Sequence, residues 1–101
     1  MSLFTKPAVV GGITATRPMR RVLLVLLTDA SNITGLTIAE TAGVGVVLVY
    51  RCLDRLEDAK WAVDELADGP YPRRRVYRLT PAGWTQAHDL LGLVRSEARR
   101  G

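Results

Sequence analysis

The chain has 101 residues, a formal net charge of +4 and a pI of about 9.8, and 48% of its residues are hydrophobic. This length is typical of one domain with a small core of its own, and the composition excludes a disordered or low-complexity chain. The basic excess suits a polyanionic partner, because Lys and Arg side chains release counterions when they meet phosphates.

The cysteine content and the apolar runs indicate the cellular compartment in which the protein resides. Cys52 is the single cysteine, so no internal disulfide can form, which favours a reducing environment. The long apolar run near the N-terminus, residues 22–27, is too short to span a bilayer and lacks a signal-peptide cleavage site. We therefore expect a cytoplasmic protein with no membrane partner.

Residues 1–17 are predicted to be an N-terminal arm, and residues 18–101 the folded domain. The arm contains Pro7 and the pair Gly11–Gly12 and shows no sustained hydrophobic period. Such a segment is either a flexible basic terminus or a short extension that packs against the domain.

A first helix is predicted from about residue 19 to residue 29, with Pro18 in its first turn. Its apolar residues, which include Val22, Leu23, Val25, Leu26 and Leu27, cover most of the circumference. A helix that is apolar nearly all round is buried on more than one side. In a domain this small, the pattern predicts that the second side meets another subunit.

Residues 30–33 are predicted to be a loop, followed by two short helices. The first of these begins at either Thr34 or Thr37, the latter forming a capping-box pattern with Glu40, and ends before Gly43. The next runs from about residue 45 to residue 60. Its buried stripe is predicted to contain Val49, Cys52, Leu53 and Leu56. Two helices joined by a glycine turn form a helix-turn-helix unit, whose second helix fits the major groove of DNA.

Two strands and a last helix complete the domain. Residues 61–66 and 73–79 read as strands, and residues 67–72 hold the turn residues of a hairpin. Thr80 caps the last helix and Pro81 occupies its first turn. The fold class is therefore mainly α with a two-stranded β wing, a winged helix-turn-helix of order α-α-α-β-β-α. The last helix carries an apolar stripe of Trp84, Ala87, Leu90, Leu91, Val94 and Ala98.

Three segments together resemble the PadR-like winged-helix transcriptional regulators. They are residues 34–44, the pattern Tyr50-Arg51-x-Leu53-x-Arg55-Leu56-Glu57, and residues 77–83, which read Tyr-Arg-Leu-Thr-Pro-Ala-Gly. The last motif is shared with MarR-like regulators. The resemblance covers about residues 19–91 and is to the shorter members of the family. It implies a homodimeric DNA-binding repressor in which the third helix reads DNA and the wing contacts the backbone.

The resemblance also assigns site residues. The expected contacts with double-stranded DNA are Thr34, Val46, Val47, Leu48, Tyr50, Arg51, Arg55, Arg73, Arg74 and Arg75. The first and last helices are implied to build the dimer interface, with Val22, Leu23, Leu26, Trp84, Leu90, Leu91 and Val94.

The arginines have simpler explanations as well. Arg51 and Arg55 are one turn apart and point the same way, which suits phosphates, but Asp54 and Asp58 at i+3 could neutralise them on a solvated face. The arginines of residues 73–75 suit DNA phosphates, but charges on an edge strand also prevent aggregation. Both alternatives remain open.

The start of the third helix departs from the family pattern. Residues 45–48 read Gly-Val-Val-Leu where such regulators usually have polar residues. These side chains would contact thymine methyl groups or a partner protein. Two alternatives to a transcriptional regulator therefore remain: a winged-helix protein-interaction module, and a centromere-binding or architectural DNA-binding protein of a plasmid or phage.

No enzyme, metal or cofactor chemistry is predicted. The sequence has no telling nucleophile–base pair and no Gly-rich phosphate loop, and His88 is its only histidine. Trp61 and Trp84 are expected in the core or at the interface. In some regulators of this kind interface aromatic residues bind planar ligands, which makes a small aromatic molecule a further candidate partner.

Overall fold

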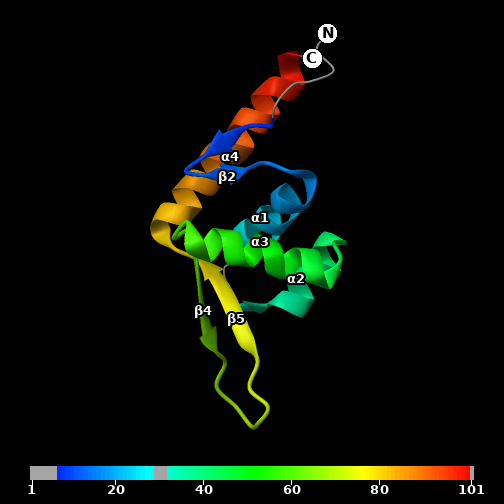
Figure 1. Ribbon diagram of the computed structural model, residues 1–101, viewed down its shortest axis with the longest axis vertical. Helices are drawn as coiled ribbons and strands as arrows, with labels where there is room; N and C mark the ends of the chain where they lie inside the picture. Colours follow the sequence, from blue (N-terminus) through cyan, green and yellow to red (C-terminus); the bar gives the residue numbers. More distant parts are fainter. Residues whose placement is uncertain (1–6, 29–31, 101) are drawn as a thin grey trace.

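The computed structural model describes residues 7–28 and 32–100 and has the winged-helix order predicted, with three additional short strands. Figure 1 shows α3 crossing in front of α1, with the β4–β5 hairpin projecting to one side and α4 to the other. The elements are β1 Val9–Val10, β2 Ile13–Thr14, α1 Arg17–Thr28, β3 Ile33–Thr34, α2 Gly35–Ala42, α3 Val46–Asp58, β4 Ala62–Leu66, β5 Arg75–Leu79 and α4 Pro81–Arg100.

The core lies where the helices meet the upper part of the sheet. The stripe predicted for α3 is buried: Val49, Cys52, Leu53 and Leu56 all face the interior. Trp61, immediately after α3, is also completely buried. Because one side of α3 is committed to the core, the opposite side is left exposed to solvent.

The helix-turn-helix is fixed by local caps. Thr34 is the N-cap of α2, since its hydroxyl accepts a hydrogen bond from the Thr37 N–H at 3.2 Å. Gly43 adopts a left-handed conformation, with φ of 66°, and ends α2. The axes of α2 and α3 differ by 115°, an angle within the range of such units. In the part of the chain that is described, no single helix is long and apolar enough to cross a membrane; only this bent pair, taken together, has the length and composition.

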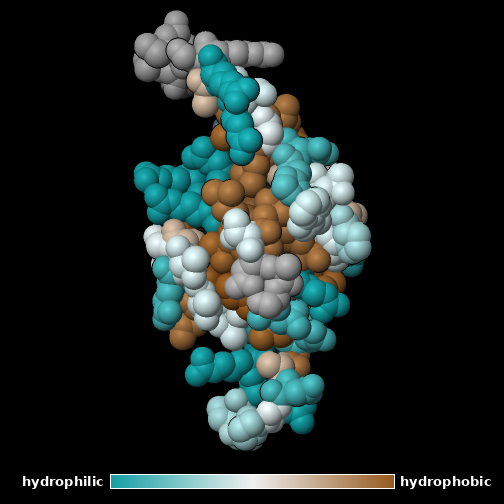
Figure 2. Space-filling model, turned by 180° about the vertical axis from the view of Figure 1, so that it is seen from behind, coloured by the Kyte–Doolittle hydropathy of each residue, from teal (hydrophilic) through white to brown (hydrophobic). Residues whose placement is uncertain are grey.

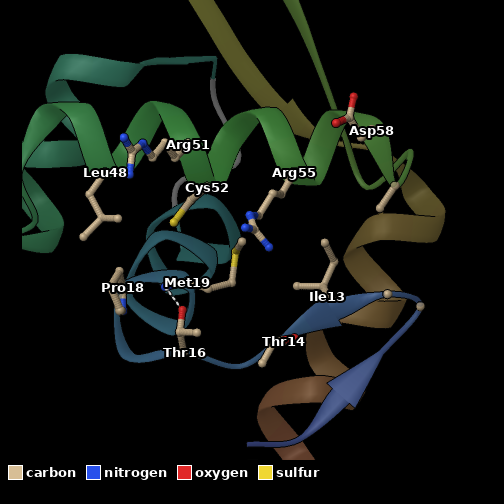
Figure 3. Close-up of a pocket in the computed structure, with 13 residues that line it drawn as sticks. Ile13, Thr14, Thr16, Pro18, Met19, Leu48, Arg51, Cys52, Arg55 and Asp58 are labelled. Atoms are coloured by element: carbon tan, nitrogen blue, oxygen red, sulfur yellow. Dashed lines mark hydrogen bonds between the residues drawn. The ribbon is translucent and has the colours of Figure 1, made fainter.

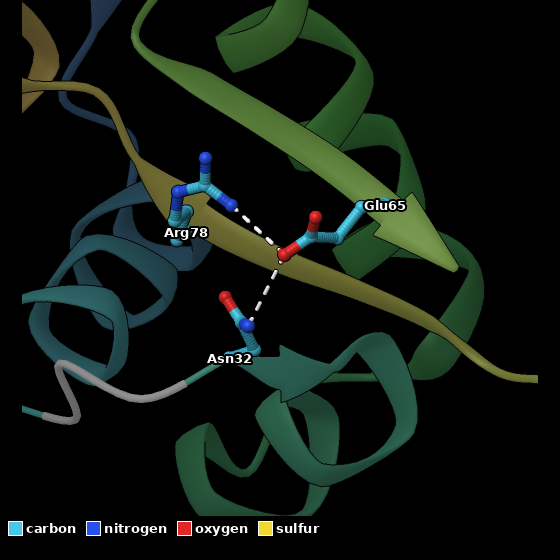
Figure 4. A network of polar contacts seen from close by, with 3 residues as sticks. All are labelled: Asn32, Glu65 and Arg78. Carbon is cyan, nitrogen blue, oxygen red and sulfur yellow. Dashed lines mark hydrogen bonds and ion pairs between the residues drawn. The ribbon is translucent and has the colours of Figure 1, made fainter. Parts of the chain in front are cut away.

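The sheet has three antiparallel strands in the order β3-β5-β4. Residues 30 and 31 of the predicted loop lie outside the described residues. Ile33, which was also predicted to be in this loop, instead pairs with Tyr77 in the edge strand β3. Figure 4 shows what joins the strands: Asn32 and Arg78 both donate hydrogen bonds to the Glu65 Oε1 atom, at 3.2 and 3.0 Å. The wing is thereby tied to the segment that enters α2.

The part of the N-terminal arm that is described forms a β-hairpin. β1 and β2 are joined by Gly11 and Gly12, both at positive φ, and the hairpin lies against α4 (Figure 1). Ile13 and Ala15 enter the core. Residues 7–16 therefore take the packed alternative, whereas residues 1–6 lie outside the described residues.

This packing corrects the role expected of four side chains. Val22, Leu23, Leu26 and Leu90 are between 0% and 4% exposed inside the chain's own core, so the structure assigns them to the core and not to a subunit interface. The reason is that α2, α3, α4 and β5 of the same chain pack against α1 and cover these side chains, while Leu24 on its remaining side stays exposed. The prediction of a second subunit assumed that the chain could not cover the apolar circumference of this helix by itself.

The cap of α4 leads to a first prediction. The Thr80 hydroxyl accepts a hydrogen bond from the Gly83 N–H and donates one to the Lys60 carbonyl oxygen, both at 2.9 Å. We expect Thr80→Ala to lower the free energy of unfolding by about 1–2 kcal/mol, measured by urea denaturation. The control is Thr85→Ala, whose hydroxyl bonds only to the Pro81 carbonyl in its own helix. Equal losses for the two variants would contradict a specific capping role.

Candidate nucleic-acid interface

The outward face of α3 is exposed to solvent. Opposite its buried stripe, Val47, Tyr50, Arg51, Asp54 and Arg55 are all exposed. Figure 1 shows this helix at the front of the molecule. The helix is thus held by its apolar side and presents a mixed apolar and charged side outward.

Arg51 and Arg55 lie on the same side of α3 but extend differently. Figure 3 shows the Arg55 side chain pointing from α3 toward α1 and the N-terminal hairpin, whereas the Arg51 side chain extends along α3 toward Leu48. The ion pairs among the described residues are Arg75 with Asp64 and Arg78 with Glu65, so neither Asp54 nor Asp58 is within ion-pair distance of these arginines. The two positive charges are therefore not neutralised by their own helix.

Tyr50 has a different position. Its ring contacts the first residue of α2 so closely that a Cβ atom built on Gly35 would lie 2.7 Å from it. The same ring meets the ring of Tyr77 edge-on, with 6.4 Å between centroids. Tyr50 therefore fixes α3 against α2 and the base of the wing, while part of its ring remains exposed.

The first turn of α3 is apolar and open. Val46, Val47 and Leu48 are exposed, Val47 by 67%. Gly45 precedes them as the N-cap and offers no side chain to the first N–H groups. This turn has the surface expected either for thymine methyl groups or for an apolar partner.

The wing separates the three consecutive arginines. β5 begins at Arg75, two residues later than predicted, and Arg75 forms an ion pair with Asp64 at 2.9 Å. Arg73 and Arg74 precede the strand and are exposed on the hairpin loop, and neither forms an ion pair within the described residues. Of the three arginines, only these two therefore have no ion-pair partner among the described residues.

Two carboxyl groups meet at the base of the wing. Burial, a hydrogen bond with Asp64 and the negative charges of Asp64 and Asp54 raise the pKa of Glu57 above its usual value. Burial, followed by the neighbouring Glu57 carboxylate, raises the pKa of Tyr77 to about 12. Asp64 belongs to β4 and Glu57 to α3, so this contact arises only from the tertiary fold.

The raised pKa of Glu57 predicts a pH-dependent effect. A carboxyl group whose pKa is raised on folding stabilises the folded state only while protonated, so its contribution is lost as the pH rises through the folded-state pKa. We therefore expect Glu57→Gln to raise the melting temperature at pH 7, and the gain to shrink as the pH falls toward 4.5, the ordinary value for glutamate. The measurement is thermal denaturation across this range. Glu40→Gln, on the exposed face of α2, is the control, and an equal gain there would contradict the assignment.

The remaining predicted interface residues lie on α4. Trp84 is 51% exposed, with its ring 4.1 Å from that of His88, and Leu91 and Val94 are partly buried. Leu24 of α1 and Leu93 of α4 are also exposed. Figure 2 shows a band of apolar side chains along the middle of the face opposite α3. Trp61, by contrast, is wholly buried and cannot contact a ligand.

The fold is similar to that of known transcriptional regulators. A MarR-family regulator from Silicibacter pomeroyi aligns with a TM-score of 0.70 and 25% identity over 84% of this chain and 56% of its own. A PadR-family regulator from Eggerthella lenta aligns with a TM-score of 0.70 and 20% identity, over 82% of this chain and 79% of its own. MepR, a transcription regulator of the Staphylococcus aureus multidrug efflux pump MepA, aligns with a TM-score of 0.67 and 19% identity, over 87% of this chain and 62% of its own.

These similarities confirm the winged-helix fold and the resemblance to PadR-type and MarR-type regulators. The chain spans a little over half the length of the MarR-family structure from Silicibacter pomeroyi. No family model matches the sequence, and no curated protein sequence is similar to it.

Proposed function

We propose that this chain is a transcriptional regulator that binds double-stranded DNA sequence-specifically as a homodimer, and that it represses transcription by occupying a promoter. The observation that supports this most directly is α3, which is held at 115° to α2 with its Arg51 side exposed. An exposed helix in a helix-turn-helix fits the major groove. The structures that share the fold are described as transcriptional regulators, and a protein with this role would act in the cytoplasm.

The site divides into base and phosphate contacts. Arg51 and Arg55 on α3 would contact base edges, and Val47 would contact thymine methyl groups. Arg73 and Arg74 on the wing would contact phosphates, which adds affinity but little sequence preference. Thr34, the N-cap at the start of α2, and Arg75, paired with Asp64, are left as weaker candidates.

Dimerisation would use the apolar surface of α1 and α4. In place of the four core residues, the exposed candidates are Leu24, Trp84 and Leu93, with Leu91 and Val94 at the edge. Two copies joined in this way would place their α3 helices about 34 Å apart, on successive major grooves of an inverted repeat.

The test is a selection of bound sequences from random duplexes. We expect an inverted repeat, dimers in analytical ultracentrifugation, and affinity that falls steeply as salt rises. Failure to enrich any motif, together with affinity indifferent to salt, would contradict the proposal. Leu93→Ser is expected to favour the monomer and to weaken binding to the inverted repeat more than to a single half-site.

A second candidate is a protein-interaction module, favoured by the exposed apolar turn of Val46, Val47 and Leu48. Such a module would ignore duplex DNA, and its binding would be almost indifferent to salt. Val47→Ser distinguishes the two: it would abolish binding to an apolar partner protein, whereas on DNA it would alter preference at one position of the selected motif.

A further inference from the structure

A small basic groove lies beside the turn that joins α2 to α3. It is lined by the start of α1, by this turn and by the first turn of α3, and its volume is about 230 Å³. Arg17 and Arg21 of α1 contribute to the lining, and among the described residues that line the groove none is acidic. The volume is below the range of about 300–1,000 Å³ that is usual for small-molecule sites, so the groove suits one charged group of a larger partner.

The two arginines have donors available for an anion. They are one helical turn apart and therefore lie on the same face of α1. Arg17 is exposed, whereas Arg21 is half-buried and its Nη1 atom donates a hydrogen bond to the Ala42 carbonyl oxygen at 3.5 Å. This bond holds the Arg21 guanidinium beside the turn and uses one of its five N–H groups. The ion pairs among the described residues involve other arginines, so neither charge is neutralised there.

The opposite wall of the groove leaves room for a group to approach. A Cβ atom built on Gly45 would meet nothing within 4 Å, and one built on Gly43 would meet only the Arg21 Nη1 atom, at 3.7 Å. Leu48 lines the groove from α3 and is exposed. Figure 3 shows its side chain extending toward Pro18 at the start of α1. The groove therefore opens to solvent directly beside the first turn of α3.

The groove and the wing lie on opposite flanks of α3. Tyr50 meets Tyr77 at the base of the wing, whereas Leu48, two residues earlier and hence about 200° away around the helix, lines the groove. A helix with its side chains is about 10–12 Å wide and nearly fills a major groove of about 12 Å, so the two phosphate backbones run along its two flanks. With α3 in a major groove, the wing faces one backbone, and Arg17 and Arg21 face the other.

We propose that Arg17 and Arg21 bind a phosphate of the DNA backbone on the flank of α3 opposite the wing. The inference rests on the proposed function, because it takes α3 as the recognition helix, and it adds two residues of α1 to the DNA site. Phosphate contacts fix the orientation of a protein on the duplex and carry no sequence information directly. The wing and α1 would thus hold the two strands on either side of the helix that reads the bases.

The first experiment measures salt dependence with matched variants. Arg17→Gln with Arg21→Gln, the α1 variant, removes two charges from the groove. Arg95→Gln with Arg99→Gln, the α4 variant, removes two exposed charges from a helix that does not line it. Affinity for the selected duplex is measured by fluorescence anisotropy between about 50 and 200 mM salt.

We expect the α1 variant to reduce the slope of log affinity against log salt concentration by about 0.9, the contribution of one phosphate. Its affinity at low salt should fall by about tenfold, since hydrogen bonds between charged groups have at least that effect. The α4 variant should change both quantities much less. An unchanged slope in the α1 variant, or an equal decrease in the α4 variant, would overturn the proposal.

A charge-conserving variant separates phosphate binding from a structural role. Arg21 contacts the turn through Ala42, so its loss could act by loosening the helix-turn-helix. Arg17→Lys with Arg21→Lys keeps both charges and should keep the salt slope of the parent. A slope reduced as far as in the α1 variant would show a structural role and overturn the phosphate contact. Thermal denaturation verifies that each variant is folded.

A second experiment locates the phosphate. Single phosphates of the selected duplex are replaced by neutral methylphosphonates, one position at a time. The α1 variant should lose no further affinity at the phosphate that its arginines no longer bind. Arg73→Gln with Arg74→Gln, in the wing, should become insensitive at phosphates of the other strand. An α1 variant that stays sensitive at every position where the parent is sensitive would overturn the proposal.

Two further outcomes separate this inference from the proposed function. If no motif is selected, but an unrelated duplex is bound with a slope that the α1 variant reduces and the α4 variant does not, the phosphate contact stands and sequence-specific regulation fails. If Arg51→Ala with Arg55→Ala abolishes specificity while the α1 variant binds as the parent does, the proposed function stands and this inference fails.

Inorganic phosphate tests the other source of the same chemistry. The full chain is titrated with it in the absence of DNA and followed by amide NMR shifts. We expect no saturable shifts in residues 17–21 and 43–48 at millimolar concentration, because a single free anion lacks the neighbouring contacts that a duplex makes with α3. Saturable binding that the α1 variant loses would show a free-anion site and overturn the assignment to DNA.

Discussion

The Gly83→Ala variant is expected to lose most of its folding stability. Gly83 is buried in the first turn of α4, directly against the backbone of Trp61. A Cβ atom there would overlap the Trp61 carbonyl oxygen and lie 2.6 Å from its Cα atom. Backbone cannot rotate away as a side chain can, so α4 must shift and Trp61 must leave its position in the core. We expect a loss of about 4 kcal/mol or more, a large part of the stability of a small domain.

The same helix offers a matched control. A Cβ atom on Gly92 would meet nothing within 4 Å. Gly92→Ala should therefore raise the free energy of unfolding by about 0.5–1 kcal/mol, since alanine restricts the unfolded chain and favours a helix. Urea denaturation of the two variants provides the comparison. A stable, cooperatively folding Gly83→Ala protein would contradict the packing of α4 on Trp61.

Replacement of both α3 arginines should abolish specific recognition. If Arg51 and Arg55 contact bases, each is worth about 1–3 kcal/mol, so Arg51→Ala with Arg55→Ala should weaken binding to the selected duplex by at least about thirtyfold. Binding to an unrelated duplex should change much less, and the fold should be retained because both side chains are exposed. Fluorescence anisotropy with the two duplexes measures both effects.

The wing provides the contrasting variant. Arg73→Ala with Arg74→Ala should weaken binding to both duplexes alike and reduce the slope of affinity against salt by about one for each phosphate that the wing no longer binds. If the α3 variant instead behaved as the wing variant does, α3 would contact only the DNA backbone. If it bound the selected duplex as tightly as the parent, α3 would not be the recognition helix.

The local signals of the fold were readable in the sequence. Gly43 and Thr80 act as caps through interactions with residues three or four positions away, so their spacing alone predicts those helix ends. For the start of α2 the sequence left Thr34 and Thr37 as alternatives, and the structure has Thr34 as the cap. The buried stripe of α3 follows from helical periodicity in the same way. The helices that these signals delimit therefore begin and end within one or two residues of the predicted positions.

The features that the sequence did not predict depend on contacts between distant segments. β1 and β2 have two residues each, too few for a period, although Gly11–Gly12 between Val10 and Ile13 is a hairpin signal. An apolar circumference on α1 indicates burial but does not say whether the chain itself or a second copy covers it. The sequence puts Arg51 and Arg55 on one side of α3, but only the tertiary structure shows that this side lies opposite the N-terminal hairpin.

The projecting wing has a practical consequence. Its loop between β4 and β5 carries Arg73 and Arg74 beyond the sheet, with Tyr71 beside them 95% exposed, while the strands themselves stay paired from Ala62 with Leu79 to Leu66 with Arg75. Trypsin cleaves after arginine and prefers accessible loops, so limited digestion should cut first at this point. A duplex lying over the loop would shield it, and the rate of that single cleavage would report directly on occupancy of the wing.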